Sequence, residues 1–270
     1  MTNNKNYFFF FGSLLFGFFL ISPILFGCKK QEITVKPSKF IPVEKKNSSL
    51  FFQYASLTEP TSGSIAYDLF SEALKDYDSL YVLATIMSGN IGGANNDDVF
   101  DSHIDTFNLS GAPNFQGNLD TLTLPEAIQA HQSSEVIVNA AYELEFDSDK
   151  IYVNTTTEFF KQVSKQDYYL TAYIIVDSII ANQAGHPNGA NTALRKTVVD
   201  VGRVPGYVPR YLGYKVATGN INNGHKFNLR FEADRLPSWT DTDQISVALV
   251  ISKYSPFGRP VFVNAHTNHQ

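Results

Sequence analysis

The residues that could do chemistry are few and lie far apart in the sequence. Cys28 is the single cysteine, so no disulfide can form within the chain. No Gly-x-Ser-x-Gly or comparable nucleophile signature is present. The six histidines are scattered at positions 103, 131, 186, 225, 266 and 269, and the last two belong to a C-terminal tail that we expect to be frayed. The sequence therefore predicts no catalytic residue, no metal site and no cofactor.

Two groups of residues have both a functional and a structural interpretation. Asn95–Asp98 could offer oxygen ligands to calcium, but a solvated loop or a helix start is the commoner use of such a run, and Asp241–Asp243 has the same alternative. Four aromatic residues lie near turn residues and could stack on a sugar or a peptide, whereas core packing is their default role. These four are Tyr207, Tyr211, Tyr214 and Trp239.

The N-terminal residues 1–27 have the zones of a secretory signal peptide. A polar start with one positive charge at Lys5 precedes an apolar stretch over residues 7–20, which a break at Ser22–Pro23 follows. The alternative is an uncleaved transmembrane helix, because the apolar stretch is nearly long enough to span a bilayer. The proline break and the small Gly27 before a cysteine favour cleavage.

The residues around the expected cleavage site resemble the lipobox of bacterial lipoproteins. Leu25 lies three residues before Cys28, and Gly27 lies next to it, although Phe26 is bulkier than the usual residue. The resemblance implies that the mature chain begins at a lipidated Cys28 and is held on membrane lipid by its acyl chains, since two or three chains give stable anchoring. Lipidation would consume the chain's one thiol.

Length and composition suit a chain with two folded domains. The 270 residues are 43% hydrophobic and 17% charged, which is enough apolar material for real cores. Because residues 1–27 contain one basic residue and no acid, the mature chain has 20 basic and 26 acidic residues and a net charge of −6. This acidic balance, without a basic run interleaved with aromatics, disfavours nucleic-acid binding.

The first half of the mature chain has an α/β pattern. Residues 28–48 contain two prolines and several lysines with little apolar periodicity, so they are predicted to be a tether after the lipidated cysteine. In residues 49–132 we expect a strand over 50–55, a loop over 57–64, a helix over 65–77 and a buried strand over 80–86. A short helix is expected over 125–132, with proline in its first turn. This order predicts parallel strand pairing.

The second half, residues 133–270, has the pattern of an all-β domain. Residues 136–144 alternate between apolar and polar, a turn follows over 146–150, and Asn222–Gly224 is typical of a hairpin turn. Short strands separated by regular turn signals favour an immunoglobulin-like β-sandwich. The expected strands cover residues 136–144, 151–159, 168–180, 192–201, 211–218, 226–232, 244–253 and 260–265.

Three segments of the second half carry a resemblance to a known family. They are Val176–Gln183, Asn191–Arg195 and Gly202. They are similar to the corresponding segments of a family of Bacteroidota outer-membrane lipoproteins that is named for a 28-kDa outer membrane protein, although the family often has His where this chain has Ala190. The resemblance implies a degenerate thioredoxin-like α/β domain over 49–132, followed by an immunoglobulin-like β-sandwich over 133–270.

The same resemblance implies that the thioredoxin-like domain has lost its redox activity. Thioredoxin-like domains place a Cys-x-x-Cys pair between the first strand and the following helix, where the helix N-terminus lowers the thiol pKa. Here that stretch is Pro60–Ser64, and hydroxyl groups cannot cycle through a disulfide. Pro113 could match the cis-proline of that fold, or it could be an ordinary trans proline in a turn.

Taken together, the sequence predicts a non-enzymatic outer-membrane lipoprotein that acts as an interaction, adhesive or accessory subunit of an envelope complex, with an outer-membrane protein as partner. The alternative is a glycan- or peptide-binding lipoprotein for nutrient uptake. Both membrane faces stay open, because Lys29–Glu32 contains one acid, whereas surface export in this phylum is associated with an acidic cluster. Asp78–Leu80 and Asp120–Leu122 resemble O-glycosylation sites of exported Bacteroidota proteins; the alternative is a turn with a capping hydroxyl.

Overall fold

The structure is a computed structural model that describes most of the residues after position 38. The described residues are 39–58, 68, 71–72, 75–77, 80–91, 94–107, 109, 114–117, 124–208, 210–236, 239 and 244–268. The predicted leader, Cys28, the loop 60–64, Pro113, the hydroxyl residues of both expected glycosylation sites and residues 241–243 lie outside them. Residues Val35–Gln270 form one compact unit. Within the described part of the chain, no helix is long and apolar enough to cross a bilayer.

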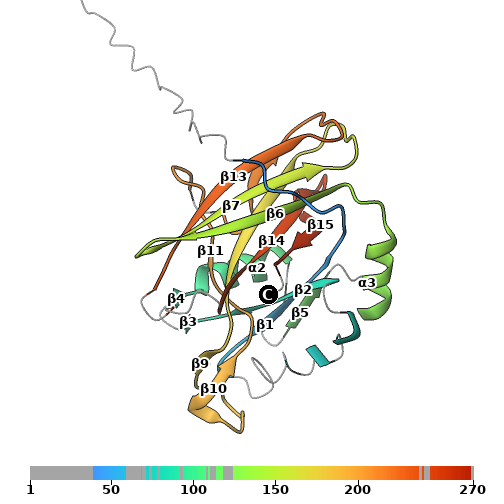
Figure 1. Ribbon diagram of the computed structural model, residues 1–270. Coiled ribbons are helices and arrows are strands. Elements are labelled where there is room, and N and C mark those ends of the chain that lie inside the picture. Colours follow the sequence, from blue (N-terminus) through green and yellow to red (C-terminus); the bar gives the residue numbers. More distant parts are fainter. Residues whose placement is uncertain are drawn as a thin grey trace, which may run out of the picture. The chain divides into compact units, whose positions relative to one another are not determined.

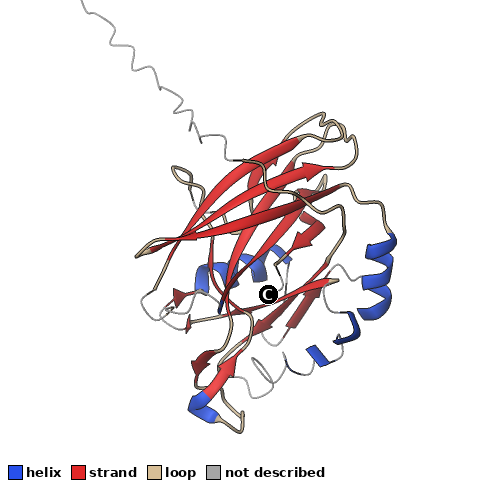
Figure 2. Cartoon of the chain, viewed as in Figure 1, coloured by secondary structure: helices blue, strands red, loops and turns tan. Residues whose placement is uncertain are grey.

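One large mixed sheet runs through both halves of the chain (Figures 1 and 2). Its strand order is β15-β14-β8-β11-β2-β1-β5, and β12 also pairs with β8. β1 and β2 are parallel, β2 and β11 are parallel, and the other neighbours in the order are antiparallel. Its strands are β1 (Ser49–Ala55), β2 (Tyr81–Met87), β5 (Asn114–Gly117), β8 (Tyr168–Val176), β11 (Thr197–Val201), β12 (Tyr214–Ala217), β14 (Ile245–Tyr254) and β15 (Pro260–His266).

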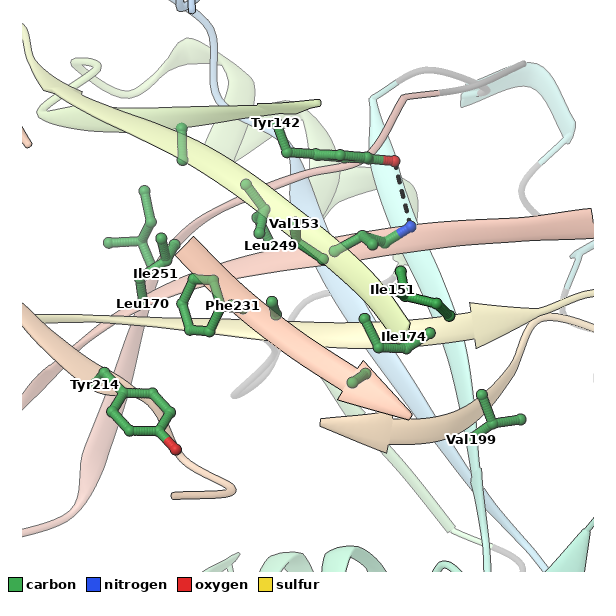
Figure 3. Close-up of a cluster of buried hydrophobic side chains, with 14 of the residues drawn as sticks. Tyr142, Ile151, Val153, Leu170, Ile174, Val199, Tyr214, Phe231, Leu249 and Ile251 are labelled. Atoms are coloured by element: carbon green, nitrogen blue, oxygen red, sulfur yellow. Dashed lines mark hydrogen bonds between the residues drawn. The ribbon is translucent and has the colours of Figure 1, made fainter. Parts of the chain in front are cut away.

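A second sheet of three strands covers part of the large one. β6 (Val138–Phe146), β7 (Lys150–Phe159) and β13 (Lys226–Asp234) are antiparallel in the order β13-β7-β6. Their inward side chains meet those of β8, β11 and β14 in the main core, part of which is seen in Figure 3. There Val153, Phe231 and Leu249 pack together, and the Val247 amide donates to the Tyr142 hydroxyl at 3.2 Å. The two sheets form a sandwich.

The first strands of the large sheet are buried on both faces. Along β1, Phe52 and Tyr54 point to one face and pack with α2 (Asp97–Phe107), while Phe51 points to the other and packs with Ile128 of α3 (Leu124–Ser133). The sheet curls, so that β15 contacts β1 and β2, and the core around α2 lies on its concave side. Continuous apolar runs such as Tyr81–Met87 are what such two-sided burial requires.

Smaller elements complete the described fold. η1 (Lys75–Tyr77) precedes β2, and β3 (Asn90–Ile91) pairs with β4 (Ala94–Asn95) before α2. β9 (Ile179–Ala181) and β10 (Thr192–Leu194) form a two-stranded arm, whose tip contains η2 (Gly189–Asn191). Two predicted long strands, 168–180 and 192–201, are therefore broken. Each break falls at a residue with positive φ, Ser178 (61°) and Lys196 (44°), which cannot continue an extended strand.

The other predicted elements compare as follows with the structure. The strands expected over 50–55, 80–86, 136–144, 151–159, 226–232, 244–253 and 260–265 and the helix over 125–132 are confirmed, and the strand over 211–218 is shorter. Most of the helix expected over 65–77 lies outside the described residues. The fold is dominated by strands, with few helices. The predicted boundary between residues 132 and 133 does not separate two sheets, because β1 and β2 share a sheet with β8, β11 and β14.

The predicted tether is wrong in its second part. Residues 41–48, which we call the strap, cross the outer face of the small sheet and are fixed by buried polar side chains. The backbone amide of Ile41 donates to the hydroxyl of Thr156 at 2.9 Å, and the side-chain amide of Asn139 donates to the Glu44 carbonyl at 2.9 Å. The strap escaped prediction because its contacts use backbone groups, which leave no apolar period in the sequence.

Candidate functional site

His103 on α2 lies at the centre of a buried hydrogen-bond network. Its ring is fully buried between two tyrosines. Nδ1 lies 2.9 Å from the hydroxyl of Tyr54 on β1, and Nε2 lies 2.9 Å from the hydroxyl of Tyr173 on β8. The Tyr173 hydroxyl in turn donates to the carbonyl of Tyr211 at 3.1 Å. The network joins two strands, a helix and a loop.

The directions of these hydrogen bonds fix the histidine tautomer. Because Tyr173 gives its one proton to the Tyr211 carbonyl, it accepts a proton from Nε2 of His103, and Nδ1 then accepts from Tyr54. Burial lowers the pKa of His103 to about 3, and burial raises the pKa of Tyr54 and of Tyr173 far above the ordinary tyrosine value. All three groups stay neutral at physiological pH.

This network is built for structure rather than for chemistry. A general base needs a pKa near the working pH and access to a substrate, and His103 has neither. What the network does is satisfy three polar groups inside an aromatic cluster: the Phe52 ring lies 5.1 Å from His103 and 5.1 Å from Tyr173, edge to face in both cases. The hydrogen bonds of His103 fix α2 against the concave face of the large sheet.

The residues of the calcium alternative at 95–98 make structural contacts around the start of α2. Asp97 accepts from the Gly89 amide at 2.6 Å, and Asn96 is buried and donates to the Val198 carbonyl. Asp98 accepts from the Tyr211 hydroxyl at 3.1 Å. These contacts fasten the start of α2, which is the structural interpretation of the run. No group of three or more metal-ligating side chains occurs among the residues that the structure describes.

The aromatic platform, which was the alternative to core packing for four aromatic residues, does not form. Tyr214 and Trp239 are each 5% exposed and belong to the main core. Tyr211 is partly buried, and Tyr207 alone of the four is well exposed, at 59%. Turn residues nearby gave no information on the direction of these side chains, whereas strand alternation places Tyr214 on the inner face of β12.

A different pair of tyrosines is accessible. Tyr169 on β8 and Tyr254 on β14 are half-buried, with ring centroids 4.7 Å apart at an interplanar angle of 74°. The ammonium of Lys215 lies 5.8 Å from the Tyr169 ring centre and 2.6 Å from the carboxylate of Asp167. The alternation of β8, where Tyr168 points inward, could have indicated that Tyr169 points outward.

The segments that carried the family resemblance have identifiable roles. Gln183, in the loop that joins β9 to β10, is buried, and its side chain donates to the Ser56 carbonyl at 3.2 Å. The Ala184 backbone amide donates to the Leu57 carbonyl at 2.8 Å. The arm therefore holds the loop that leaves β1. Gly202 packs so closely on the other sheet that a Cβ there would lie 2.9 Å from the Cβ of Phe231.

Comparisons with known proteins identify a similar fold. No protein-family model and no curated protein matches the chain. Among solved structures, HBP35 of Porphyromonas gingivalis is similar with a TM-score of 0.63 at 12% identity, over 84% of this chain and 76% of that chain. A domain of the outer membrane lipoprotein Omp28 from Porphyromonas gingivalis has a TM-score of 0.24 at 15% identity, over 47% of this chain and 87% of that chain, which is too low to support an argument. The match to HBP35 shows a shared fold and nothing further.

Proposed function

We propose that this chain is a non-enzymatic outer-membrane lipoprotein, anchored through acylated Cys28, whose folded part serves as an interaction or accessory subunit of an envelope complex. The outer-membrane assignment rests on the resemblance of segments 176–183, 191–195 and 202 to Bacteroidota lipoproteins. The anchor rests on the leader and on the lipobox-like residues before Cys28.

The position of the strap determines how far the folded unit could lie from an anchor at Cys28. Ile41 is bonded to the small sheet, and it follows Cys28 by 13 residues. Fully extended, those residues span at most about 45 Å. A lipid on Cys28 would therefore keep the folded unit close to the membrane, and the pull of the anchor would act on the strap. Only the part of the predicted tether before the strap is available as a linker.

The proposal that the chain is not an enzyme is supported by the buried chemistry of its described part. The described groups with the largest pKa shifts, His103, Tyr54 and Tyr173, bond to one another in the core. We further propose that β1, β2, β5 and α3 are a thioredoxin-like unit. The order β2-β1-β5, with β1 parallel to β2 and antiparallel to β5, supports it. In that unit, Pro60–Ser64 would replace the redox pair, and the two facing sheets would be the immunoglobulin-like part.

The anchor is tested with Cys28→Ala in the full chain. We expect the variant to lose incorporation of a fatty-acid probe and to leave the membrane fraction, while Ser38→Ala, a matched change in the same segment, behaves as wild type. A Cys28→Ala protein that still labels with the probe and still sediments with membranes would exclude the lipid anchor.

The accessory role is tested by native pull-down from detergent-solubilised outer membranes. A stoichiometric protein partner, retained in wild type and absent from a pull-down with an unrelated lipoprotein, is expected. A clean monomer without a reproducible partner would contradict the complex. Proteinase shaving of intact cells then decides between the periplasmic and the surface face.

A further inference from the structure

The region around the accessible tyrosine pair combines exposed apolar groups with positive charge. Phe257, at the tip of the β14–β15 hairpin, is 91% exposed. The hairpin leads directly from Tyr254, whose ring meets Tyr169. Burial and the neighbouring Tyr169 raise the pKa of Tyr254, and the positive charge of the nearby Arg210 opposes that rise. We call Phe257, Tyr254, Tyr169, Arg210, Lys215 and Arg259 the tyrosine–cation patch.

The hairpin tip that presents Phe257 is held in a fixed shape. The Ser255 amide donates to the Arg259 carbonyl at 2.8 Å, and the Gly258 amide donates to the Ser255 carbonyl at 2.9 Å. Gly258 takes φ of +76°, a conformation that suits glycine. The exposed phenyl ring is thus supported by a closed turn, and its exposure is a property of the fold rather than of a loose end.

The charge of the patch is opposite to that of the whole protein. The protein has a net charge of −5, whereas the patch contains three cations, Arg210, Lys215 and Arg259. Among the described residues, Lys215 of the patch forms an ion pair with Asp167. A partner of this surface would have to be anionic.

An apolar tip with tyrosines and cations behind it matches the layers of a membrane interface. Phenyl rings partition into the acyl boundary, tyrosines prefer the headgroup level, and Arg or Lys contact anionic lipid phosphates. A flat sugar would instead need an open ring face, but the Tyr169 and Tyr254 rings meet at 74°. We propose that the tyrosine–cation patch docks on the surface of an anionic lipid bilayer and sets the orientation of the folded unit there. This inference rests on the proposed lipid anchor, which would bring the patch within reach of the membrane.

The chain's cysteine content provides the test. In full-length, host-processed protein carrying Pro256→Cys next to Phe257, a lipidated Cys28 leaves one reactive thiol, whereas a free Cys28 leaves two. The number of attached dyes therefore reports on the anchor separately from the patch. The matched control carries Ile180→Cys on the β9–β10 arm, another exposed apolar residue, at 60%. Both are reconstituted in phosphatidylcholine vesicles with and without phosphatidylglycerol.

We expect the dye at position 256 to be quenched by spin-labelled lipid and shielded from an aqueous quencher in anionic vesicles, and the dye at position 180 to stay aqueous. Adding Phe257→Asp should abolish the lipid contact. Adding Arg259→Glu should weaken it by at least about fivefold, the effect of about one surface cation on an anionic membrane. Equal aqueous access at both positions, or equal lipid contact at both, would overturn the proposal. If either of these results is obtained with one dye per chain, Cys28 is lipidated and the anchor is retained, but docking of the patch on the membrane is excluded.

Discussion

The two edges of the sandwich are closed by different chemistry. Where β6 faces β15, the side chain of Asn264 is fully buried; it donates to the carbonyls of Lys46 and Val138 and accepts from the amide of Ser48, each at 2.9 Å. We call this the amide edge. Where β13 faces β11, the side chain of Arg203 bonds to Asp234 at 2.8 Å, and Lys150 bonds to the same carboxylate at 2.6 Å. We call this the ionic edge.

The difference between the edges is one of burial. At the ionic edge, Asp234 is 55% exposed, so water and salt can replace either partner at little cost. At the amide edge Asn264 is buried away from solvent, so each broken bond leaves a polar group without a partner in the core. The amide edge should therefore contribute far more to the free energy of unfolding than the ionic edge. The backbone pair between Arg203 and Glu232, at 2.8 Å in both directions, is what holds the ionic edge in register.

The largest effect is expected from Asn264→Ala. The substitution strands the Lys46 and Val138 carbonyls and the Ser48 amide, and we expect the free energy of unfolding to fall by about 4 kcal/mol. Urea unfolding measures it, with Asn223→Ala in the exposed hairpin turn as the matched control. Asn264→Asp should destabilise at least as much, because a carboxylate would face two carbonyl oxygens. Equal midpoints for Asn264→Ala and the control would show that the edge contributes little.

A smaller effect is expected where the strap begins. Thr156→Val keeps the shape of the side chain but removes the acceptor for the Ile41 amide and the donor to Asn228. We expect a loss of about 1–2 kcal/mol, together with faster trypsin cleavage after Lys45 and Lys46 as the strap detaches. Thr58→Val, at an exposed site, is the control. Cleavage at the wild-type rate would mean that Thr156 does not hold the strap.

Mild acid should loosen the amide edge before the ionic edge. His131 packs beside Asn264 and Ser48, and burial lowers its pKa. When the amide edge opens, His131 becomes exposed and binds a proton more readily than it does when the edge is closed. The stability of the closed edge is therefore complete above the ordinary histidine pKa and falls as the pH drops below it. At the ionic edge, Lys150 and Arg203 lower the pKa of Asp234, so that contribution is lost only below the ordinary aspartate range. Between pH 7 and 5, amide exchange at Ser48 should rise severalfold relative to exchange at Arg203. The ratio should stay constant in His131→Gln; a constant ratio in wild type would contradict the assignment.

Much of the fold could be predicted from the sequence, and the amide edge could not. Apolar runs and alternation identify β1, β2, β6 and β7, because burial of side chains leaves a period in the sequence. Asn264 and Asn139 read as ordinary polar residues in strands, since a side chain that bonds to a distant backbone leaves no such pattern. The same holds for His103, whose tyrosine partners are 49 and 70 residues away. Core packing, the default interpretation of Tyr214 and Trp239, is confirmed, whereas the platform alternative relied on nearby turn residues, which do not indicate the face that a side chain takes.

The smallest effect is expected at the ionic edge itself. Asp234→Asn removes the charge that Lys150 and Arg203 share but retains an oxygen acceptor, while the Arg203–Glu232 backbone pair is untouched. Because the site is half exposed, we expect a loss below about 1 kcal/mol at low ionic strength, shrinking further in about 0.5 M salt as screening grows. Urea unfolding at both salt concentrations measures it. A loss as large as that of Asn264→Ala, and independent of salt, would mean that Asp234 is energetically buried and that the two edges are alike. A small, salt-sensitive loss of unfolding free energy would instead show that the amide edge contributes more to the stability of the sandwich than the ionic edge does.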